Sequence, residues 1–341
     1  MPGDKGSGVY SPFLSGVETF LYKKNLFAFA AMAALLSACQ GGQALPPPPA
    51  SQVQTQSEDR ELQSLSLFEA QNVATGERVR VFPTREAVDA FRLAQAGQRT
   101  TEATSPLTYH GGPVQTAPHI YIVFWGSAWN TSTGDPDGVM ARMKSFFGIV
   151  GGSRWLNSVT QYTQNGGQHV GNAAGSFIGS YVDTTSTPPR RPTQSQMAAE
   201  AAKAAAKYGD YSASAAYIVA MPHGIKPSGF GTQYCAYHSS TTAAGQTIAW
   251  TNDPYFPDAG ASCGAGSVNS PGTLDGVTIV AGHEQGETET DPFPNSGWLD
   301  SSGAENGDKC AWTNLENNPN AGGYPTQPLW SNSNNGCVQS Y

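Results

Sequence analysis

Two dense apolar runs place the strongest constraint on what this chain can fold into. "PHIYIVFWG" at 118–126 and "SAAYIVAMP" at 214–222 are rich in β-branched and aromatic residues. Apolar runs without polar alternation are typical of strands buried on both faces. Between them, "TQSQMAAEAAKAAAKYG" at 193–209 predicts an Ala-rich helix, with Thr193 or Ser195 as its N-cap and the final glycine as its stop. Strands and helices are therefore expected to alternate.

Weaker patterns extend this alternation along the chain. Further strands are expected at 79–82, 175–183 and 247–250, and further helices at 85–96 and 138–147. The residues after 291 are mostly turn formers. Together these patterns predict an α/β or α+β fold, with a mixed β-sheet, flanking helices and a loop-rich C-terminal segment pinned by disulfides.

Four cysteines outside the N-terminal region indicate that disulfides hold the C-terminal segment in place. Cys235, Cys263, Cys310 and Cys337 are even in number, which in an exported chain indicates two disulfides with three pairings open. Their spacing matches no tight C-x-x-C zinc pattern. Proximity in sequence favours Cys235–Cys263 and Cys310–Cys337, each closing a loop of roughly 27 residues and stabilising the fold by about 3 kcal/mol.

The N-terminal region carries an export signal. "KKNLFAFAAMAALLSACQ" has two lysines and then an apolar run from Leu26 to Leu36, which is too short to span a bilayer. Its "LSAC" ending resembles a bacterial lipobox, in which Cys39 becomes the lipidated first residue. An ordinary secretory signal is the alternative. We therefore expect residues 1–39 to be a signal peptide with a lipobox, and the protein to be a lipoprotein at the cell envelope or outer membrane, or secreted.

Composition and charge divide the rest of the chain. Residues 40–57 are rich in Pro, Gly and Gln and are expected to form a flexible tether. Residues 58–106 are expected to be an N-terminal extension or a pro-segment, and residues 107–341 to form the main domain. The formal net charge is −8, with no basic run outside "PRR" at 189–191. Nucleic acid is therefore excluded as a partner, and a membrane is expected only through the lipid anchor.

The motif "HEQGETETDP", which starts at His283, carries the chemistry. It begins like the H-E-x-x-H helix of zinc peptidases, but has a glutamate in place of the second histidine. A helix from Asp275, its expected N-cap, to Thr290 puts His283 and Glu287 one turn apart, about 5–6 Å between Cβ atoms. The pair can then hold one metal ion, while Glu284 serves as general base toward a water that the ion activates.

The third ligand and the ion stay open. Glu305 is the first choice, since it follows Glu287 at an interval similar to that in glutamate-ligated zincins. Asp308 and His238 are alternates, and either could orient substrate instead. Zinc accepts carboxylate ligands, but one histidine with two carboxylates also suits manganese or calcium. The opposing interpretation is a solvated acidic helix end without chemistry, whose charges oppose the helix dipole.

Five stretches in order resemble the EXORDIUM, or phosphate-induced, protein family. They are "YHGGPVQTAPHIYIVFWG", "PSGFGTQYCAYHS", "LDGVTIVAGHEQGETETDP", "GWLDSSGAENGDKCAW" and "PLWSNSNNGC", and they extend from about Thr108 to the end. The closer match is the secreted bacterial and fungal branch, which shares H-E-x-x-E-x-x-T-[DN]-P and E-[IN]-[GA]-D-x-C. Asn306 stands where many members carry isoleucine.

This resemblance implies a secreted, zincin-like metallopeptidase that acts on protein or peptide substrates. The positions that map onto family motifs are His283, Glu284, Glu287, Glu305, Asp291, Asp308, Cys235, His238 and Cys310. Asp291 is thereby a further alternate ligand. Plant members are often described without enzyme activity. The alternative function is therefore a non-catalytic extracellular protein, with a structural metal site, that binds cell-wall glycan or another surface partner.

Overall fold

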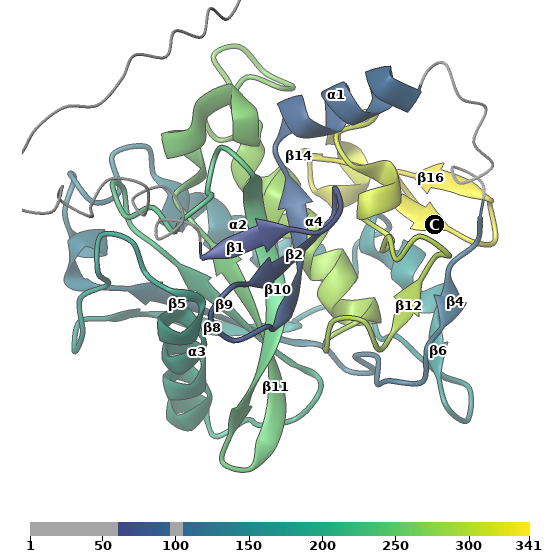
Figure 1. Cartoon of the computed structure of the whole chain (residues 1–341), viewed down its shortest axis with the longest axis horizontal. Coiled ribbons are helices and arrows are strands. Elements are labelled where there is room, and N and C mark those ends of the chain that lie inside the picture. The colour runs from purple at the N-terminus through teal and green to yellow at the C-terminus, as the bar shows by residue number, and fades with distance from the viewer. Residues whose placement is uncertain (1–60, 96–104) are drawn as a thin grey trace, which may run out of the picture. The chain divides into compact units, whose positions relative to one another are not determined.

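The computed structural model describes residues 61–95 and 105–341, and a sheet forms the core of this part of the chain. Its strands are β1 (Leu62–Ser64), β2 (Glu69–Asn72), β3 (Arg78–Pro83), β5 (His119–Trp125), β8 (Phe177–Asp183), β9 (Ala215–Ala220), β10 (Tyr234–Ala243) and β11 (Gln246–Asp253). The order across this eight-stranded sheet is β1-β2-β3-β10-β11-β9-β5-β8 (Figure 1). The predicted signal peptide, the tether and Cys39 lie outside the described residues.

The sheet is mixed, as predicted. At one side of the sheet β1, β2, β3, β10 and β11 pair antiparallel with their neighbours. At the other side β11, β9, β5 and β8 pair parallel. The flanking helices are α1 (Arg85–Gln95), α2 (Val139–Val150), α3 (Gln194–Tyr208) and α4 (Asp275–Thr290). This arrangement confirms an α+β fold with a mixed sheet and flanking helices. No helix in the described ranges is long and apolar enough to cross a bilayer.

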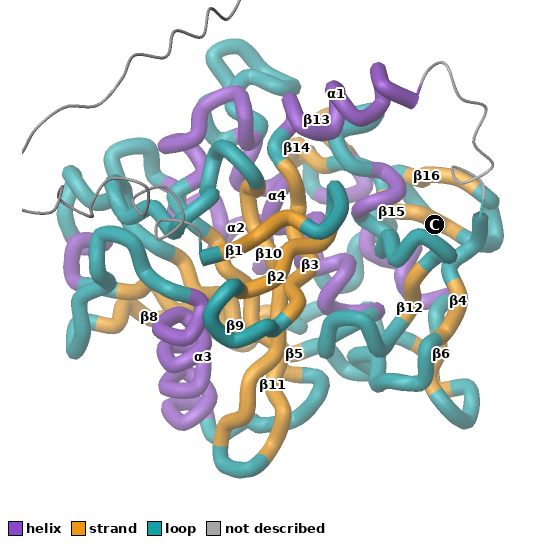
Figure 2. Tube along the Cα trace, viewed as in Figure 1, coloured by secondary structure: helices purple, strands orange, loops and turns teal. Residues whose placement is uncertain are grey.

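Short elements and loops fill the rest of the described residues (Figure 2). The 3₁₀ helices are η2 (Ser127–Asn130), η3 (Leu156–Gln161), η4 (Phe256–Cys263), η5 (Asp308–Cys310) and η6 (Pro319–Ala321). The two-stranded ribbons pair β4 (Thr108–Tyr109) with β12 (Trp298–Leu299), β6 (Thr163–Gln164) with β7 (Gln168–His169), β13 (Glu316–Asn318) with β14 (Tyr324–Thr326), and β15 (Leu329–Ser331) with β16 (Gly336–Val338). The C-terminal segment is therefore loop-rich, as expected.

The strongest sequence signals correspond directly to elements of the core. β9 is buried along its whole length, and β5 is buried at every residue after His119. In α3 the Thr193 side chain accepts a hydrogen bond from the Gln196 backbone N–H, and the Gln196 side chain accepts one from Thr193, which completes a capping box. Thr193, and not Ser195, is therefore the N-cap of this helix.

The strand β10 was not predicted, although it joins the two halves of the sheet. Its sequence "YCAYHSSTTA" mixes polar and aromatic residues, and it forms a hairpin with β11. The turn is made by Ala244 and Gly245, which have φ angles of 48° and 78°. Two successive positive φ values fit a type I′ turn, but Ala-Gly is a weaker sequence signal for it than Asn-Gly. The hairpin places His238 at the centre of the sheet.

The register of the sheet sends α3 and α4 to opposite faces. Tyr121 packs against Tyr208 of α3, with ring centroids 4.4 Å apart. The residues in register with this tyrosine across the next strands are Tyr217, Trp250 and Ser239. His238 precedes Ser239 and so points to the other face. There its ring lies 3.2 Å from a carboxylate oxygen of Glu284 in α4.

The motif helix α4 spans Asp275–Thr290, as predicted, but differs from the prediction in two respects. Its N-cap is Leu274, whereas the carboxylate of Asp275 accepts hydrogen bonds from the backbone N–H groups of Val268 and Asn269 in the preceding loop. The N-cap prediction for Asp275 is therefore wrong. In addition, every residue of α4 is buried. A helix buried on all sides has no solvent-exposed face, so the acidic end of α4 is not solvated.

Both disulfide pairings are as predicted. Cys235–Cys263 joins β10 to η4, and Cys310–Cys337 joins η5 to β16. The first bond holds the segment that packs against the start of α4. The second anchors the loop that follows β12. The two bonds therefore stabilise the two segments on either side of the motif helix in sequence.

Gly276, near the start of α4, makes one of the closest backbone contacts of the fold. A Cβ at this position would lie 1.9 Å from the carbonyl oxygen of Cys263. We expect Gly276→Ala to lower the free energy of unfolding by about 3 kcal/mol or more, because the helix must separate from a disulfide-anchored segment. Chemical denaturation measures this change.

The matched control is Gly148→Ala in α2. This glycine is exposed, and a Cβ there would meet no described atom within 4 Å. The substitution should raise the free energy of unfolding by about 0.5–1 kcal/mol, since alanine favours the helix. If both variants unfolded at the same denaturant concentration, the close approach at Gly276 would be contradicted.

Candidate metal centre

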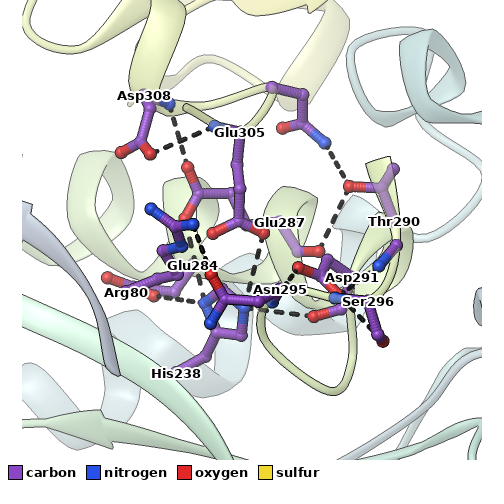
Figure 3. Close-up of polar contacts among 12 residues, drawn as sticks. Arg80, His238, Glu284, Glu287, Thr290, Asp291, Asn295, Ser296, Glu305 and Asp308 are labelled. Carbon is purple, nitrogen blue, oxygen red and sulfur yellow. Dashed lines mark hydrogen bonds and ion pairs between the residues drawn. The ribbon is translucent and has the colours of Figure 1, made fainter. Parts of the chain in front are cut away.

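Six titratable side chains from three segments converge on the α4 face of the sheet, and Figure 3 labels all of them except His283. They are His238 of β10, His283, Glu284 and Glu287 of α4, and Glu305 and Asp308 from the loop after β12. None of the six is more than 3% exposed. The i, i+4 spacing on α4 aligns His283 with Glu287, as the sequence predicts.

Side-chain hydrogen bonds and a glycine fix the loop that carries Glu305 and Asp308. Asn306 Nδ2 donates to the Gly286 carbonyl at 2.8 Å, one turn from the end of α4. The backbone N–H of Asp308 donates to Glu287 Oε1 at 2.9 Å. Between them, a Cβ at Gly307 would lie 2.6 Å from His283 Nδ1 and 2.8 Å from Glu287 Oε1. Only glycine therefore lets the loop approach the helix this closely.

The first group of potential ligands contains the predicted pair. His283 Nε2 lies 3.0 Å from Glu287 Oε1 and 3.7 Å from Asp308 Oδ1. One ligand atom from each of these three residues lies within 4.8 Å of the other two. The predicted His283–Glu287 pair is thus brought together, with the alternate ligand Asp308 as its neighbour.

The second group contains the preferred third ligand. His238 Nδ1 lies 3.8 Å from Glu287 Oε2, and the other ring nitrogen, Nε2, lies 3.6 Å from Glu305 Oε1. One ligand atom from each of the three residues again lies within 4.8 Å of the others. Glu305 therefore belongs with His238 and Glu287. The trio His283, Glu287 and Glu305 does not form one such group among the described residues. Glu284 Oε2 lies 3.2 Å from His238 Nδ1, at the edge of this second group.

Asp291 lies at the end of α4 but its carboxylate is directed elsewhere. It accepts hydrogen bonds from the backbone N–H groups of Asn295, Ser296 and Gly297 at 2.7, 3.1 and 2.6 Å. Its carbonyl oxygen lies 3.2 Å from His238 Nε2. The Ser296 hydroxyl donates to the same carboxylate at 3.3 Å. Asp291 thus holds the turn after α4 with its carboxylate and orients the His238 ring with its carbonyl.

Three residues of the site were not predicted from the sequence. Arg80 of β3 is the register partner of His238, and its guanidinium donates to Asn295 Oδ1. Phe82, two residues along, stacks on the His283 ring with centroids 3.8 Å apart. Gln327 Nε2 lies 3.1 Å from His283 Nδ1. The period of two in the predicted strand 79–82 places Arg80 and Phe82 on one face, but nothing in the sequence says which strand they pair with.

Burial dominates the electrostatics of the cluster. It lowers the pKa of His283 to about 4 and that of His238 to about 3, so both rings are neutral at pH 7. Burial raises the pKa of Glu287 to about 8. Burial, and then the charge of Glu287, raises the pKa of Glu284, Glu305 and Asp308 well above the usual range. A cation among these carboxyls would favour their ionised forms and displace protons.

Several polar atoms of the cluster lack a partner. Within residues 61–95 and 105–341, no hydrogen bond is made by either carboxylate oxygen of Glu305, by Glu284 Oε1 or by His283 Nε2. Buried polar atoms are almost always hydrogen-bonded, because desolvation without a partner costs about 1–3 kcal/mol. Imidazole nitrogens and carboxylate oxygens are ligands that a divalent metal uses, and Glu305 and His283 each belong to a group of ligand spacing. The residues therefore fit a metal ion.

The comparisons with known proteins leave this fit as the main guide to function. No protein family, characterised protein or solved structure matched the chain.

A cavity of about 290 Å³ lies beside the cluster. Asp308 forms part of its wall, so the cavity reaches one of the candidate ligands. Its apolar lining comes from residues 61–95 and is formed by Leu67, Phe68, Val88 and Phe91. Arg92 and Lys309 line the same space. Asp300 lines it as well and pairs with Lys309 at 3.0 Å. The cavity thus combines an apolar wall with charges of both signs next to a candidate metal ligand.

Proposed function

We propose that this protein is an exported metal-dependent hydrolase, and most specifically a zinc endopeptidase. One observation carries the proposal: two histidines and three carboxylates from β10, α4 and the loop after β12 form two groups of ligand spacing, and several of their atoms have no hydrogen bond among the described residues. A cluster of this composition without a cation would consist of several buried, mutually repelling acids.

The side chains divide into three roles under this proposal. His283, His238, Glu287, Glu305 and Asp308 hold the metal, which when bound polarises a carbonyl group and activates water near neutral pH. Glu284, with one free oxygen, accepts and returns protons. Arg80 is the register partner of His238 in the sheet. Its positive charge favours the ionised forms of Glu287 and Glu305.

The cavity beside Asp308 suggests which substrates fit. Its apolar wall would accept a large apolar side chain, as in an unfolded protein or peptide. Arg92 donates to the carbonyl of Ala311, and Lys309 lies 3.0 Å from Asp300, so both cations are held in place at the rim of the site. A peptide with an apolar side chain, followed by a carboxylate or a carbonyl oxygen, matches this lining.

Location and family belong to the same proposal. The two disulfides are compatible with an extracellular location. The lipobox ending at Cys39 and the five EXORDIUM-like stretches are the sequence grounds for an exported member of that family. Mass spectrometry of the mature N-terminus tests the lipid anchor directly.

Substitution of Glu284 tests the chemistry. Glu284→Gln keeps the size of the side chain but removes the base, so hydrolysis of a denatured protein substrate is expected to fall about 10²–10⁴-fold while metal content stays unchanged. Metal analysis and a peptidase assay on the same preparation measure both. Equal cleavage by wild type and variant, or no cleavage by either, would overturn the peptidase assignment.

A specific observation supports a second candidate, a structural metal site in a non-catalytic extracellular protein. The ligand side chains are at most 3% exposed, and structural metal sites are closed to solvent. The two candidates differ in one measurement. If the site is structural, chelation lowers the melting temperature and no wild-type preparation cleaves peptides. If the protein is a hydrolase, it loses activity on chelation and regains activity when zinc is added.

A further inference from the structure

The two carboxylate oxygens of Glu287 face different partners. Oε1 lies 3.0 Å from His283 Nε2, whereas Oε2 lies 3.8 Å from His238. Asp308 lies beside His283, and Glu305 and Glu284 lie beside His238. Glu287 therefore belongs to both groups of ligand spacing, one set with His283 and Asp308 and the other set with His238 and Glu305.

The spacing within each set matches that of metal ligands. Metal–ligand bonds of about 2.0–2.2 Å in a tetrahedral site put neighbouring ligand atoms about 3.3–3.6 Å apart. In the His283 set both distances, 3.0 Å and 3.7 Å, start from Nε2. In the His238 set the 3.8 Å distance to Glu287 starts from Nδ1 and the 3.6 Å distance to Glu305 starts from Nε2, but one ligand atom from each of these residues lies within 4.8 Å of the others. Each set thus has one imidazole, a carboxylate of its own and one oxygen of Glu287.

The geometry points to a centre for two metal ions bridged by Glu287, one ion held by His238 and Glu305 and the other by His283 and Asp308. This inference rests on the proposed metal site and goes beyond it in number and arrangement. Two-metal hydrolases hold their ions about 3.5–4 Å apart, which a carboxylate spans when each oxygen binds one ion. The oxygens of Glu287 are directed in this way.

Unpartnered atoms occur in both sets, and this is independent of the charge of the cluster. Glu305, which is fully buried, makes no hydrogen bond with either carboxylate oxygen within the described residues, and His283 Nε2 in the other set makes none. A single ion in one set would leave the other set without a partner. Two ions would satisfy both.

Charge is consistent with two ions. The four carboxyls of Glu284, Glu287, Glu305 and Asp308 carry four negative charges when ionised, and Arg80 supplies one positive charge from β3. One divalent ion leaves this buried group with a net charge of −1 and two leave it with +1, so either number brings the charge to the same small magnitude. Buried charge is tolerated only when it is compensated at close range.

The hydrogen bonds of the two histidines predict the order of binding. His238 Nε2 faces the carbonyl of Asp291, which can only accept, so Nδ1 keeps its lone pair. Gln327 Nε2 faces His283 Nδ1 and can only donate, so the neutral His283 ring carries its proton on Nε2. A half turn of the Gln327 amide would free Nε2, but it would break the hydrogen bond that Gln327 Nε2 donates to the Gly307 carbonyl at 2.8 Å. The ion at His238 is therefore expected to bind first and more tightly.

Titration of the metal-free full-length protein with Mn²⁺ tests the inference. Two ions per chain are expected, the first at least about tenfold tighter, and electron paramagnetic resonance should show exchange coupling between them once both are bound. Glu305→Gln and Asp308→Asn should each bind a single ion without coupling. Glu289→Gln, a buried glutamate of α4 whose side chain accepts from Gln285, should still bind two coupled ions.

The outcomes separate this inference from the proposed function. One ion per wild-type chain, or two ions without coupling, would overturn the bridged pair while leaving a single-metal hydrolase in place. No bound ion would overturn both. Near-ultraviolet circular dichroism of each variant identifies any that fail to fold, and the wild-type stoichiometry does not depend on them.

Discussion

Glu287→Gln is expected to abolish both metal binding and hydrolysis. The side chain keeps its shape, but the amide replaces one of the two oxygens that face His283 and His238. Loss of this oxygen should weaken metal binding more than about 100-fold, since even the loss of residues behind the ligands costs about 10–100-fold. Equilibrium dialysis with zinc measures the affinity, and a peptidase assay measures the activity.

Stability gives a second and independent measurement of Glu287→Gln. The variant replaces a carboxyl whose pKa burial raises to about 8 with a neutral group, so the metal-free protein should be as stable as wild type or more stable. Zinc at 100 times its dissociation constant should stabilise wild type by about 2.7 kcal/mol and the variant not at all. Thermal unfolding with and without zinc measures both.

The control for Glu287→Gln is Glu289→Gln, two residues further along the same helix. Glu289 is equally buried, and burial raises its pKa to about 8 as well, but its side chain accepts from Gln285 and is in neither ligand set. It should bind zinc and cleave substrate like wild type. If both variants lost metal, the effect would come from changing a buried acid in α4, and the assignment of Glu287 as a ligand would be contradicted.

The elements predicted correctly are those whose signals are local. The continuous apolar runs of β5 and β9 and the capping box of α3 depend on residues near in sequence, and α4 ends where Pro292 excludes helix. The spacing of His283 and Glu287 follows from helix geometry alone. These parts of the fold and site need no tertiary information.

The parts that could not be predicted depend on pairings between distant segments. β10 has no strand pattern of its own, and its place is set by neighbours on both sides. Arg80 lies near the site only because β3 pairs with β10. Likewise, Glu305 joins His238 and Asp308 joins His283 because Asn306 and Gly307 fix the loop against α4. The sequence indicated these residues as candidate ligands, but it could not show that Glu305 groups with His238 and Asp308 with His283.

Removal of residues 1–106 is expected to prevent folding of the remaining chain. β3 lies inside the sheet between β2 and β10, so a chain that begins at Leu107 exposes the edge of β10. It also loses the side chains of Val79, Val81, Phe82 and Val88, of which none is more than 7% exposed. Burial of these four contributes about 1.5–3 kcal/mol each, which together is comparable with the whole stability of a domain, about 5–15 kcal/mol.

The matched control for this truncation is a chain that begins at Glu61, which keeps β1, β2, β3 and α1. It should unfold cooperatively on heating and bind metal, whereas the chain from Leu107 should show neither near-ultraviolet circular dichroism nor a cooperative transition. The result also decides between an N-terminal extension and a pro-segment for residues 58–106. An extension requires that the mature protein starts at or before Glu61, which mass spectrometry can determine. A chain from Leu107 that unfolds at the same temperature as the control would show instead that the first three strands are dispensable, as expected for a pro-segment.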